Sequence, residues 1–222
     1  MNDESQDVLN LPRPRHAHRE IASFGGPGED DLWIAGGYLR VAEIAACDWI
    51  AHGPDDSLPI PILYNYRHGI ERSLKWLIRL AAHYLDQGGY AQEKLSPEAL
   101  NEKLRTHNIK KLADHLECYM HALEIDAPDN RIGEASRELA AWLDSEDETG
   151  EIYRNAIVGM KGSQHRARSK QVDINFYEQV NELHKLANLI HRGYWTYLNE
   201  YANCRPITSA TRGTTSAPPR LT

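Results

Sequence analysis

Cysteine is scarce in this chain of 222 residues, and its spacing excludes the usual uses of paired thiols. The three cysteines, Cys47, Cys118 and Cys204, form no CxxC pair. An odd number of cysteines does not suit a disulfide framework, and such a framework belongs to oxidising compartments. The cysteine content therefore indicates a reducing compartment, and we expect the protein to be cytoplasmic.

Long apolar runs and an excess of basic charge are also missing. No uninterrupted apolar run approaches the ~18 residues that a membrane-spanning helix requires, and the N-terminus lacks the apolar segment of a signal peptide. The formal net charge of −7 gives no global basic footprint. We therefore expect neither membrane insertion nor secretion, and any contact with nucleic acid requires a local basic patch.

The common catalytic fingerprints are absent as well. The sequence has no P-loop, no GxSxG elbow and no Rossmann fingerprint. The histidines on the expected helices are six or seven residues apart, not four apart as in the zinc motif HExxH. We therefore predict neither a metal site nor a bound cofactor. The histidines in question are His115, His121, His184 and His191.

Helical periodicity between two irregular ends predicts one all-α domain. Residues 1–29 mix charge, proline and glycine without periodicity, so we expect a mobile arm. Residues 204–222 form a Ser/Thr/Pro/Gly tail that is unable to bury a core. Residues 30–203 lie between them and suit a helical bundle of four to five helices, with a short extended or hairpin insertion before the last long helix.

The longest helical pattern runs from Pro61 to Asp86, where apolar residues recur every three or four positions. The insertion is expected at residues 152–158, with a turn at Lys161-Gly162. Other helices are expected from Asp30 or Asp31 to Gly53, from Ser96-Pro97-Glu98 to before Arg105, from a Thr106 cap to Leu123, from about Asn130 to Asp144, and from an Asp173 cap to Asn203.

Four polar residues distinguish the central helix. Arg67 and Glu71 lie one turn apart beside the apolar stripe, so both are expected at the edge of the buried region. His68 and Lys75 are within i+3 or i+4 reach of Glu71. One interpretation is a site in which Arg67 binds phosphate, His68 titrates and Glu71 orients one of them. The other is a structural ladder of ion pairs, Arg67 to Glu71 to Lys75.

Two further places carry candidate residues. His107 and Asn108 stand at a helix start, where they either present a ring and an amide to an anion or act in N-terminal capping. Arg154 follows a short extended piece and reaches either a ligand or the acidic residues 146–148. We expect Arg67, His107 and Arg154 to converge in one pocket.

One segment of the chain is strongly basic. Residues 161–170 include Arg166 and Arg168, and they either hold a phosphate backbone or balance the acidic loop before them. In the first case Tyr153 or Tyr177 supplies a stacking face. Both alternatives stay open.

Three ordered motifs carry a resemblance to a known family. Residues 64–78 read YNYRHGIERSLKWLI, residues 106–112 read THNIKKL, and residues 150–155 read GEIYRN. This set, spread over roughly residues 32–201, resembles a bacterial HEPN-like helical domain. The resemblance implies a dimeric all-α module of the kind found in ribonuclease toxins, in partners of nucleotidyltransferases and in antiviral defence.

The chain departs from the pattern of the enzymatic members of that superfamily. Those proteins carry an arginine followed a few residues later by a histidine at the start of a late helix, where the pair promotes attack by a ribose 2′-hydroxyl. Here that spacing occurs only between Arg13 and His18, in the expected mobile arm, and a mobile segment does not hold catalytic geometry. If the protein is a ribonuclease, we expect a non-standard, metal-independent site.

The first functional hypothesis is therefore a HEPN-like protein of defence or toxin–antitoxin type that binds RNA or nucleotide. The alternatives are a catalytically silent helical module that binds a protein partner, and an enzyme acting on a small phosphorylated substrate. Tyr194, Trp195, Tyr197 and Tyr201 surround the last helix with more aromatics than one buried stripe needs, which predicts a homodimer. The catalytic candidates are Arg67, His68, Glu71 and His107, and the ligand-binding candidates are Lys75, Asn108, Arg154, Arg166 and Arg168.

Overall fold

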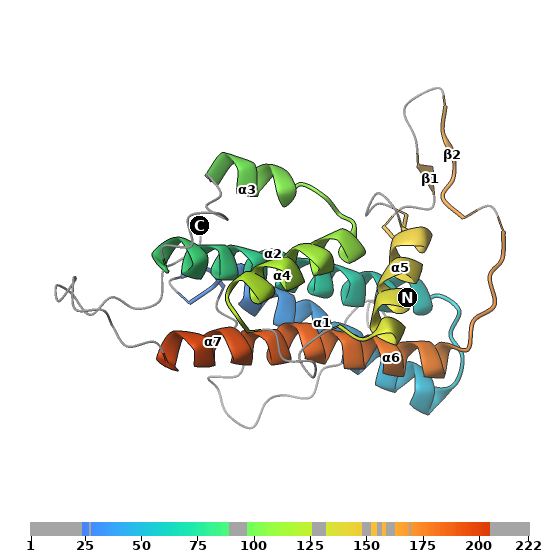
Figure 1. Cartoon of the computed structure of the whole chain (residues 1–222). Helices are drawn as coiled ribbons and strands as arrows, with labels where there is room; N and C mark the ends of the chain where they lie inside the picture. Colours follow the sequence, from blue (N-terminus) through green and yellow to red (C-terminus); the bar gives the residue numbers. More distant parts are fainter. Residues whose placement is uncertain are drawn as a thin grey trace, which may run out of the picture.

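The structure of the chain is a computed structural model, predominantly helical, in which helices pack around one long central helix (Figure 1). It describes residues 24–26, 28–88, 97–125, 132–147, 152–154, 157–158, 163–168 and 170–204. The all-α prediction is confirmed for this part of the chain, and most of the predicted arm and tail lies outside it. The helices are α1 (Asp31–His52), α2 (Pro59–Gln87), α3 (Pro97–Lys103), α4 (Ile109–Ala122), α5 (Glu134–Glu146), α6 (Phe176–Asn188), the π-helical segment η4 (Leu189–Tyr194) and α7 (Trp195–Cys204).

The central helix α2 is the predicted stretch with two residues added at its N-terminal end and one at its C-terminal end. Pro59 lies in its first turn, where a missing N–H group costs no hydrogen bond. Its apolar residues fall at helical spacing, and all face the core that α2 forms with α1, α4 and α6. These buried residues include Ile62, Tyr66, Ile70, Leu74, Leu77, Ala81 and Leu85.

Helices α1 and α2 approach closely because a glycine of α2 faces α1. A Cβ atom on Gly69 would lie 2.6 Å from Leu39 Cδ2 and 3.1 Å from the Ala35 carbonyl oxygen. α1 matches this short separation by burying small residues, among them Ala42. Gly36 of α1 is similar, because a Cβ atom there would lie 3.2 Å from His191 Nε2, and the contact joins α1 to η4.

Polar residues cap α1, α4 and α6, and the cap of α4 corrects a prediction. Asn108 caps α4, since its Oδ1 accepts from the Lys111 N–H at 2.7 Å. Thr106 instead accepts from the Asn108 N–H at 3.1 Å, so His107 precedes the helix and does not lie in its first turn. The cap is thus the polar residue directly before Ile109, the first buried residue of the helix. The sequence alone did not show which of the polar residues from Thr106 to Asn108 would be the cap.

The cap of α6 follows the same rule. Asn175 caps this helix, and the predicted cap, Asp173, instead accepts from Gln171 Nε2 at 3.0 Å. Asn175 directly precedes the buried Phe176. At the start of α1 the cap is Asp30, which is one of the two residues, Asp30 and Asp31, that were predicted as its cap.

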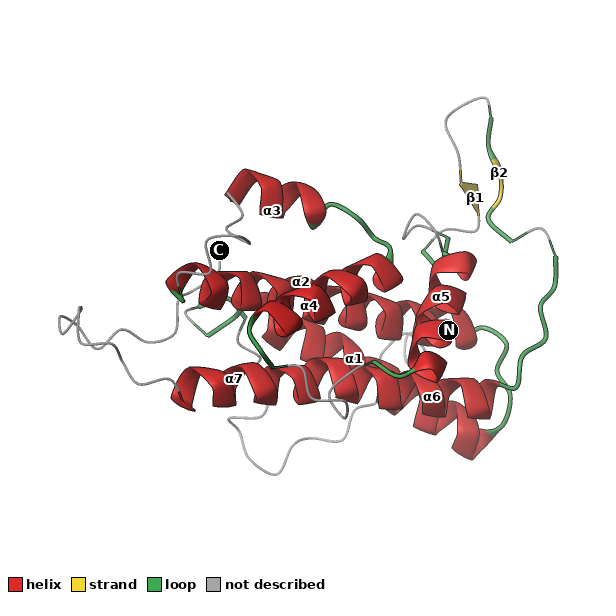
Figure 2. Ribbon diagram, in the orientation of Figure 1, coloured by secondary structure: helices red, strands yellow, loops and turns green. Residues whose placement is uncertain are grey.

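The last helical run is continuous from α6 through η4 into α7 (Figure 2). The π-helical segment changes the angular position of the residues that follow it. Tyr194, the last residue of this segment, is buried, and Tyr197 and Tyr201 pack against the core. Of the four aromatics behind the dimer prediction only Trp195 is exposed, at 41%. The oligomeric state remains a prediction, but these aromatics no longer require a partner subunit.

The predicted hairpin is present in a shorter form. β1 (Ile157–Val158) pairs antiparallel with β2 (His165–Arg166), and the hairpin stands out from the helices near α5 (Figure 1). Residues 152–154, expected to be extended, form a turn. The predicted turn at Lys161-Gly162 lies outside the described residues. Among the helices that the structure describes, none is both long and apolar enough to cross a membrane.

The close contact at Gly69 yields a testable prediction. Gly69→Ala should lower the free energy of unfolding by about 1–3 kcal/mol, because overpacking against Leu39 and Ala35 outweighs the better helix propensity of alanine. Gly37→Ala is the matched control, since a Cβ atom there meets nothing within 4 Å, and it should stabilise the protein by up to about 1 kcal/mol. Urea denaturation measures both. Equal stability of the two variants would show that α1 and α2 separate at little cost.

Candidate functional site

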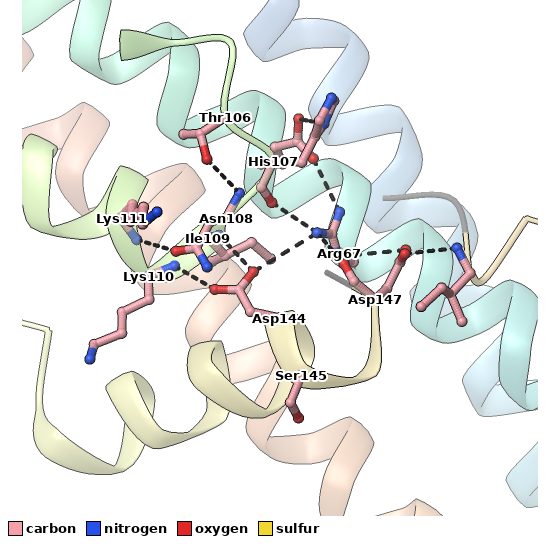
Figure 3. A network of polar contacts seen from close by, with 12 residues as sticks. Arg67, Thr106, His107, Asn108, Ile109, Lys110, Lys111, Asp144, Ser145 and Asp147 are labelled. Carbon is pink, nitrogen blue, oxygen red and sulfur yellow. Dashed lines mark hydrogen bonds and ion pairs between the residues drawn. The ribbon is translucent and has the colours of Figure 1, made fainter. Parts of the chain in front are cut away.

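A buried arginine of α2 joins three parts of the chain (Figure 3). Arg67 is 3% exposed, and its Nη2 donates to the carbonyl oxygens of His107 and Asp147, both at 2.8 Å. Its Nη1 donates to Glu71 Oε2 at 3.2 Å. One guanidinium therefore ties α2 both to the segment before α4 and to the end of α5. Because it is buried and engaged in this way, Arg67 is placed to organise the site and not to bind a phosphate from solvent.

Asp144, near the end of α5, caps α4 from a neighbouring helix. Its two carboxylate oxygens accept from the N–H groups of Ile109 and Lys110, at 2.8 and 2.9 Å (Figure 3). Burial raises the pKa of Asp144 despite these two hydrogen bonds, which act in the opposite direction. With the Lys111 N–H bonded to Asn108, the first three N–H groups of α4 are occupied. This geometry favours capping over anion binding as the role of Asn108.

Glu71 connects this buried network to the surface. Its Oε1 accepts from Lys75 Nζ at 2.8 Å and lies 2.9 Å from His107 Nδ1. Burial alone would raise the pKa of Glu71, but Lys75, His107 and Arg67 together outweigh burial and hold it below its usual value. Glu71 is therefore a buried, ionised carboxylate, and the ladder from Arg67 to Glu71 to Lys75 is present.

His107 is the exposed end of the network. Its side chain is 52% exposed, and Glu71 fixes the ring through Nδ1. In the neutral ring that donates from Nδ1 to a carboxylate, Nε2 is an acceptor. The ring nitrogen that Glu71 leaves for a ligand is therefore Nε2. An imidazole held in this way by a carboxylate is suited to moving a proton.

His68 belongs to a different set of contacts. Its Nε2 accepts from Arg72 Nε at 3.0 Å, and the ring stacks on Tyr64 with centroids 5.5 Å apart. Burial, and after it the charge of Arg72, lowers the pKa of His68, which favours the neutral ring as acceptor. The four polar residues predicted as one cluster therefore divide, because His68 contacts Arg72 while Glu71 turns to His107.

Arg154 lies on a segment that the network anchors. It is exposed in the turn at residues 152–154, and Asp147 Oδ1 anchors this turn by accepting from the Ile152 N–H at 2.8 Å. Its charge also contributes, after burial and Arg72, to the lowered pKa of His68. Arg67 thus contacts the backbone carbonyl of His107, and Arg154 lies on the segment anchored to the same network. A pocket shared by all three stays a prediction.

The two arginines of the basic segment have separate positions. Arg166 is exposed on β2. Arg168 donates to the carbonyl oxygen of Ile152 and lines a cavity beside α5 and α6. Within the described part of the chain, neither arginine forms a hydrogen bond or ion pair with His107 or Glu71. The structure therefore assigns Arg168 to the surroundings of the 152–154 turn.

Two residues of the network, Asp144 and Asp147, were not predicted. Asp144 is 7% exposed and Asp147 is fully buried. Asp147 Oδ2 lies 3.7 Å from Arg67 Nε, and neither atom has a hydrogen-bond partner among the described residues. One signal was available in the sequence, since the helix dipole disfavours carboxylates at a C-terminal end. Two aspartates in that position indicate partners elsewhere in the fold.

Asp144 provides a test of the capping between helices. Asp144→Asn should lower the free energy of unfolding by about 1–3 kcal/mol, because the amide can accept from only one of the two N–H groups and turns its own N–H group toward the other. A chain of this length should then lose roughly 2–4 °C in melting temperature for each kcal/mol. The exposed Glu138→Gln on the same helix is the control. Equal melting temperatures for the two variants would contradict the proposed cap.

The charge state of Glu71 predicts a dependence of stability on pH. Because its folded pKa is lowered, its contribution is present above the unfolded value of about 4.3 and is lost as pH falls through the folded value. Glu71→Gln should therefore show a smaller loss of stability than the wild type between about pH 6 and about pH 3, although it is less stable at neutral pH. Urea titrations across this range measure the slopes. Identical slopes would show that Glu71 does not titrate differently in the folded state.

No protein-family model, no curated protein and no solved structure matches this chain. The HEPN-like resemblance therefore stays an expectation from three sequence motifs, and the function has to be inferred from the site itself.

Proposed function

We propose that this chain is a HEPN-like helical protein of defence or toxin–antitoxin type that binds and cuts RNA, with His107 as its acid–base residue. One observation supports this function most directly: a half-exposed imidazole lies 2.9 Å from a buried carboxylate, that of Glu71. Arg67 is a positioning residue in this proposal, because it fixes Glu71 and the backbone of His107 without reaching the surface.

The surroundings of Glu71 make it an effective orienting group. Two cations, Arg67 and Lys75, hold the carboxylate from its two oxygens, so it has little freedom to turn away from His107. Because Glu71 holds Nδ1 of the His107 ring, the direction in which Nε2 points is also fixed. Catalysis depends on reactive atoms that are held in this way. Histidine also changes protonation near neutral pH more readily than other side chains.

Cations near His107 support a phosphate-bearing substrate. Lys110 and Lys111 are exposed in the first turn of α4, three and four residues after His107 (Figure 3). Lys75 donates to Oε1 of Glu71, the same carboxylate oxygen that His107 contacts, and is 16% exposed. The whole chain has a net charge of −7, so a local group of lysines is the arrangement that an RNA backbone requires.

The proposed reaction needs no metal ion. Neutral His107 takes the proton of a ribose 2′-hydroxyl through Nε2, and the 2′-oxygen forms a bond to the adjacent phosphorus. The bond between that phosphorus and the 5′-oxygen breaks, and the 5′-oxygen takes a proton from water. The products are a 2′,3′-cyclic phosphate and a 5′-hydroxyl end, with a protonated His107 that returns its proton to solvent.

The test compares two imidazole–carboxylate pairs of this chain. His107→Ala should reduce cleavage of a mixed-sequence single-stranded RNA about 10²–10⁴-fold without unfolding the protein, because the ring is half exposed. His52→Ala is the matched control, since His52 contacts Asp48 at 3.0 Å with both groups exposed and no buried network behind them. Gel analysis of the RNA measures the rates, and the cyclic phosphate end identifies the reaction.

Two results would contradict the proposal in different ways. Equal cleavage by the His107→Ala and wild-type proteins would remove His107 from the reaction. A wild type that binds RNA, measured by fluorescence anisotropy, but does not cut it would restrict the function to binding.

A second candidate function is a catalytically silent module that binds a protein partner. It is favoured by the outer face of α1, where Trp33 is 62% exposed and Val41 and Ile44 are each 54% exposed. These residues extend over about three turns of α1 and form an exposed apolar strip. A strip of large exposed apolar side chains often marks a contact with a partner. Absence of both RNA binding and RNA cleavage in the wild type would favour this function.

A further inference from the structure

A cavity of about 540 Å³ lies next to the buried network. It is bounded by the end of α1, the start of α2, the end of α5, the 152–154 turn and the segment before α6. This volume is within the range of about 300–1,000 Å³ that is usual for small-molecule pockets. Aromatic side chains form much of its lining, namely Trp49, Trp142, Tyr153 and Phe176.

Tyr153 contributes a hydroxyl group in need of a partner. Its side chain is buried at 6% exposure, and its hydroxyl has no hydrogen-bond partner among the described residues. Burial, with the nearby charges of Glu146 and Asp147, raises the pKa of Tyr153, so the group stays protonated and can donate. The hydroxyl oxygen has almost no accessible surface, so a ligand reaches it only after a small shift of the Tyr153 side chain toward the cavity. A buried hydroxyl without a partner costs about 1–3 kcal/mol, and a ligand that accepts its hydrogen bond favours that shift.

The buried network fixes the position of Tyr153. Asp147, whose carbonyl oxygen is held by Arg67, accepts from the Ile152 N–H, and Arg168 donates to the Ile152 carbonyl oxygen. The residue before Tyr153 is therefore held at both its N–H and its carbonyl group. A pocket wall fixed in this way is formed before any ligand arrives, which favours affinity.

The charged groups of the lining restrict the type of ligand. Arg168 and Lys170 are two residues apart on one segment and can hold a phosphate. Asp56, Glu146 and Asp173 also line the cavity, and carboxylates accept hydrogen bonds from sugar hydroxyls. Because the carboxylates outnumber the cations, di- and triphosphates are disfavoured relative to one phosphate group.

We propose that this cavity binds one nucleotide unit with a single phosphate group, either free or as an exposed unit of RNA. The choice of a nucleotide rests on the proposed function, whereas the site is separate from His107. The base stacks on the aromatic lining, an interaction worth about 1–3 kcal/mol per base, and the Tyr153 hydroxyl donates to it. The phosphate lies at Arg168 and Lys170, and the carboxylates bind the ribose.

The test measures binding of defined probes by isothermal titration calorimetry. Nucleoside 5′-monophosphates should bind at least about tenfold more tightly than ribose 5-phosphate, which has no base, and than adenosine, which has no phosphate. ATP should bind more weakly than AMP. Competition of a short single-stranded RNA against AMP shows whether the nucleotide unit can come from RNA or only from a free nucleotide. RNA displaces AMP only if one of its exposed nucleotides enters the cavity.

Two variants and one control locate the binding. Tyr153→Phe removes only the hydroxyl and should weaken AMP binding about tenfold without loss of melting temperature, because no internal hydrogen bond is broken. Lys170→Glu should weaken it at least as much. Lys185→Glu reverses the charge of another exposed lysine, one outside the cavity, and should leave the affinity unchanged.

The outcomes separate this site from the proposed function. No binding of any monophosphate, or unchanged affinity in both cavity variants, overturns the proposed nucleotide site even where RNA cleavage depends on His107. Binding of AMP that both cavity variants weaken supports the site even where the wild type neither binds nor cuts RNA, a result that would overturn the proposed function alone.

Discussion

The burial of the Arg67 guanidinium is the constraint on which the rest of the site depends. A charge so enclosed has to be met by acceptors, because removal of one partner of a buried ion pair costs about 3–5 kcal/mol. The two carbonyl groups that meet it are 40 and 80 positions away in the sequence. Arg67 therefore sets the positions of the residues before α4 and after α5 relative to α2.

Local spacing allowed much of the fold and part of this network to be predicted. The period of the apolar residues gave α2, and the i+4 separations gave the contacts of Glu71 with Arg67 and Lys75. Asp144 and Asp147 could not be placed, because their partners are distant in sequence and each looks like an ordinary polar helix end. The caps at Thr106 and Asp173 were wrong by two residues for a related reason. Several neighbouring polar residues can cap equally well locally, and burial of the next residue decides.

The part of the candidate site that Arg67 holds together was predicted. The part that depends on which face of α2 a residue occupies was not. His107 joins Glu71 because the Arg67 side chain holds the His107 backbone nearby. His68 follows Arg67 by one position, about 100° around the helix, so it faces Arg72 instead. The last helix shows a similar limit, since its π-helical segment cannot be seen in a simple periodic pattern.

A buried ionic network of this kind is seldom the most stable way to fill a core. Apolar side chains of similar volume are often as stabilising or more so, because the desolvation of charges offsets their attraction.

What the network provides is a fixed orientation of the groups around it. Hydrogen bonds fix angles that apolar contacts leave free, and here they fix two things at once. On one side, Glu71 sets the ring of His107. On the other, Asp147 sets the turn that carries Tyr153 into the cavity wall. Because Arg67 bonds to both Glu71 and Asp147, a single side chain connects the group that orients the imidazole to the group that anchors the cavity wall.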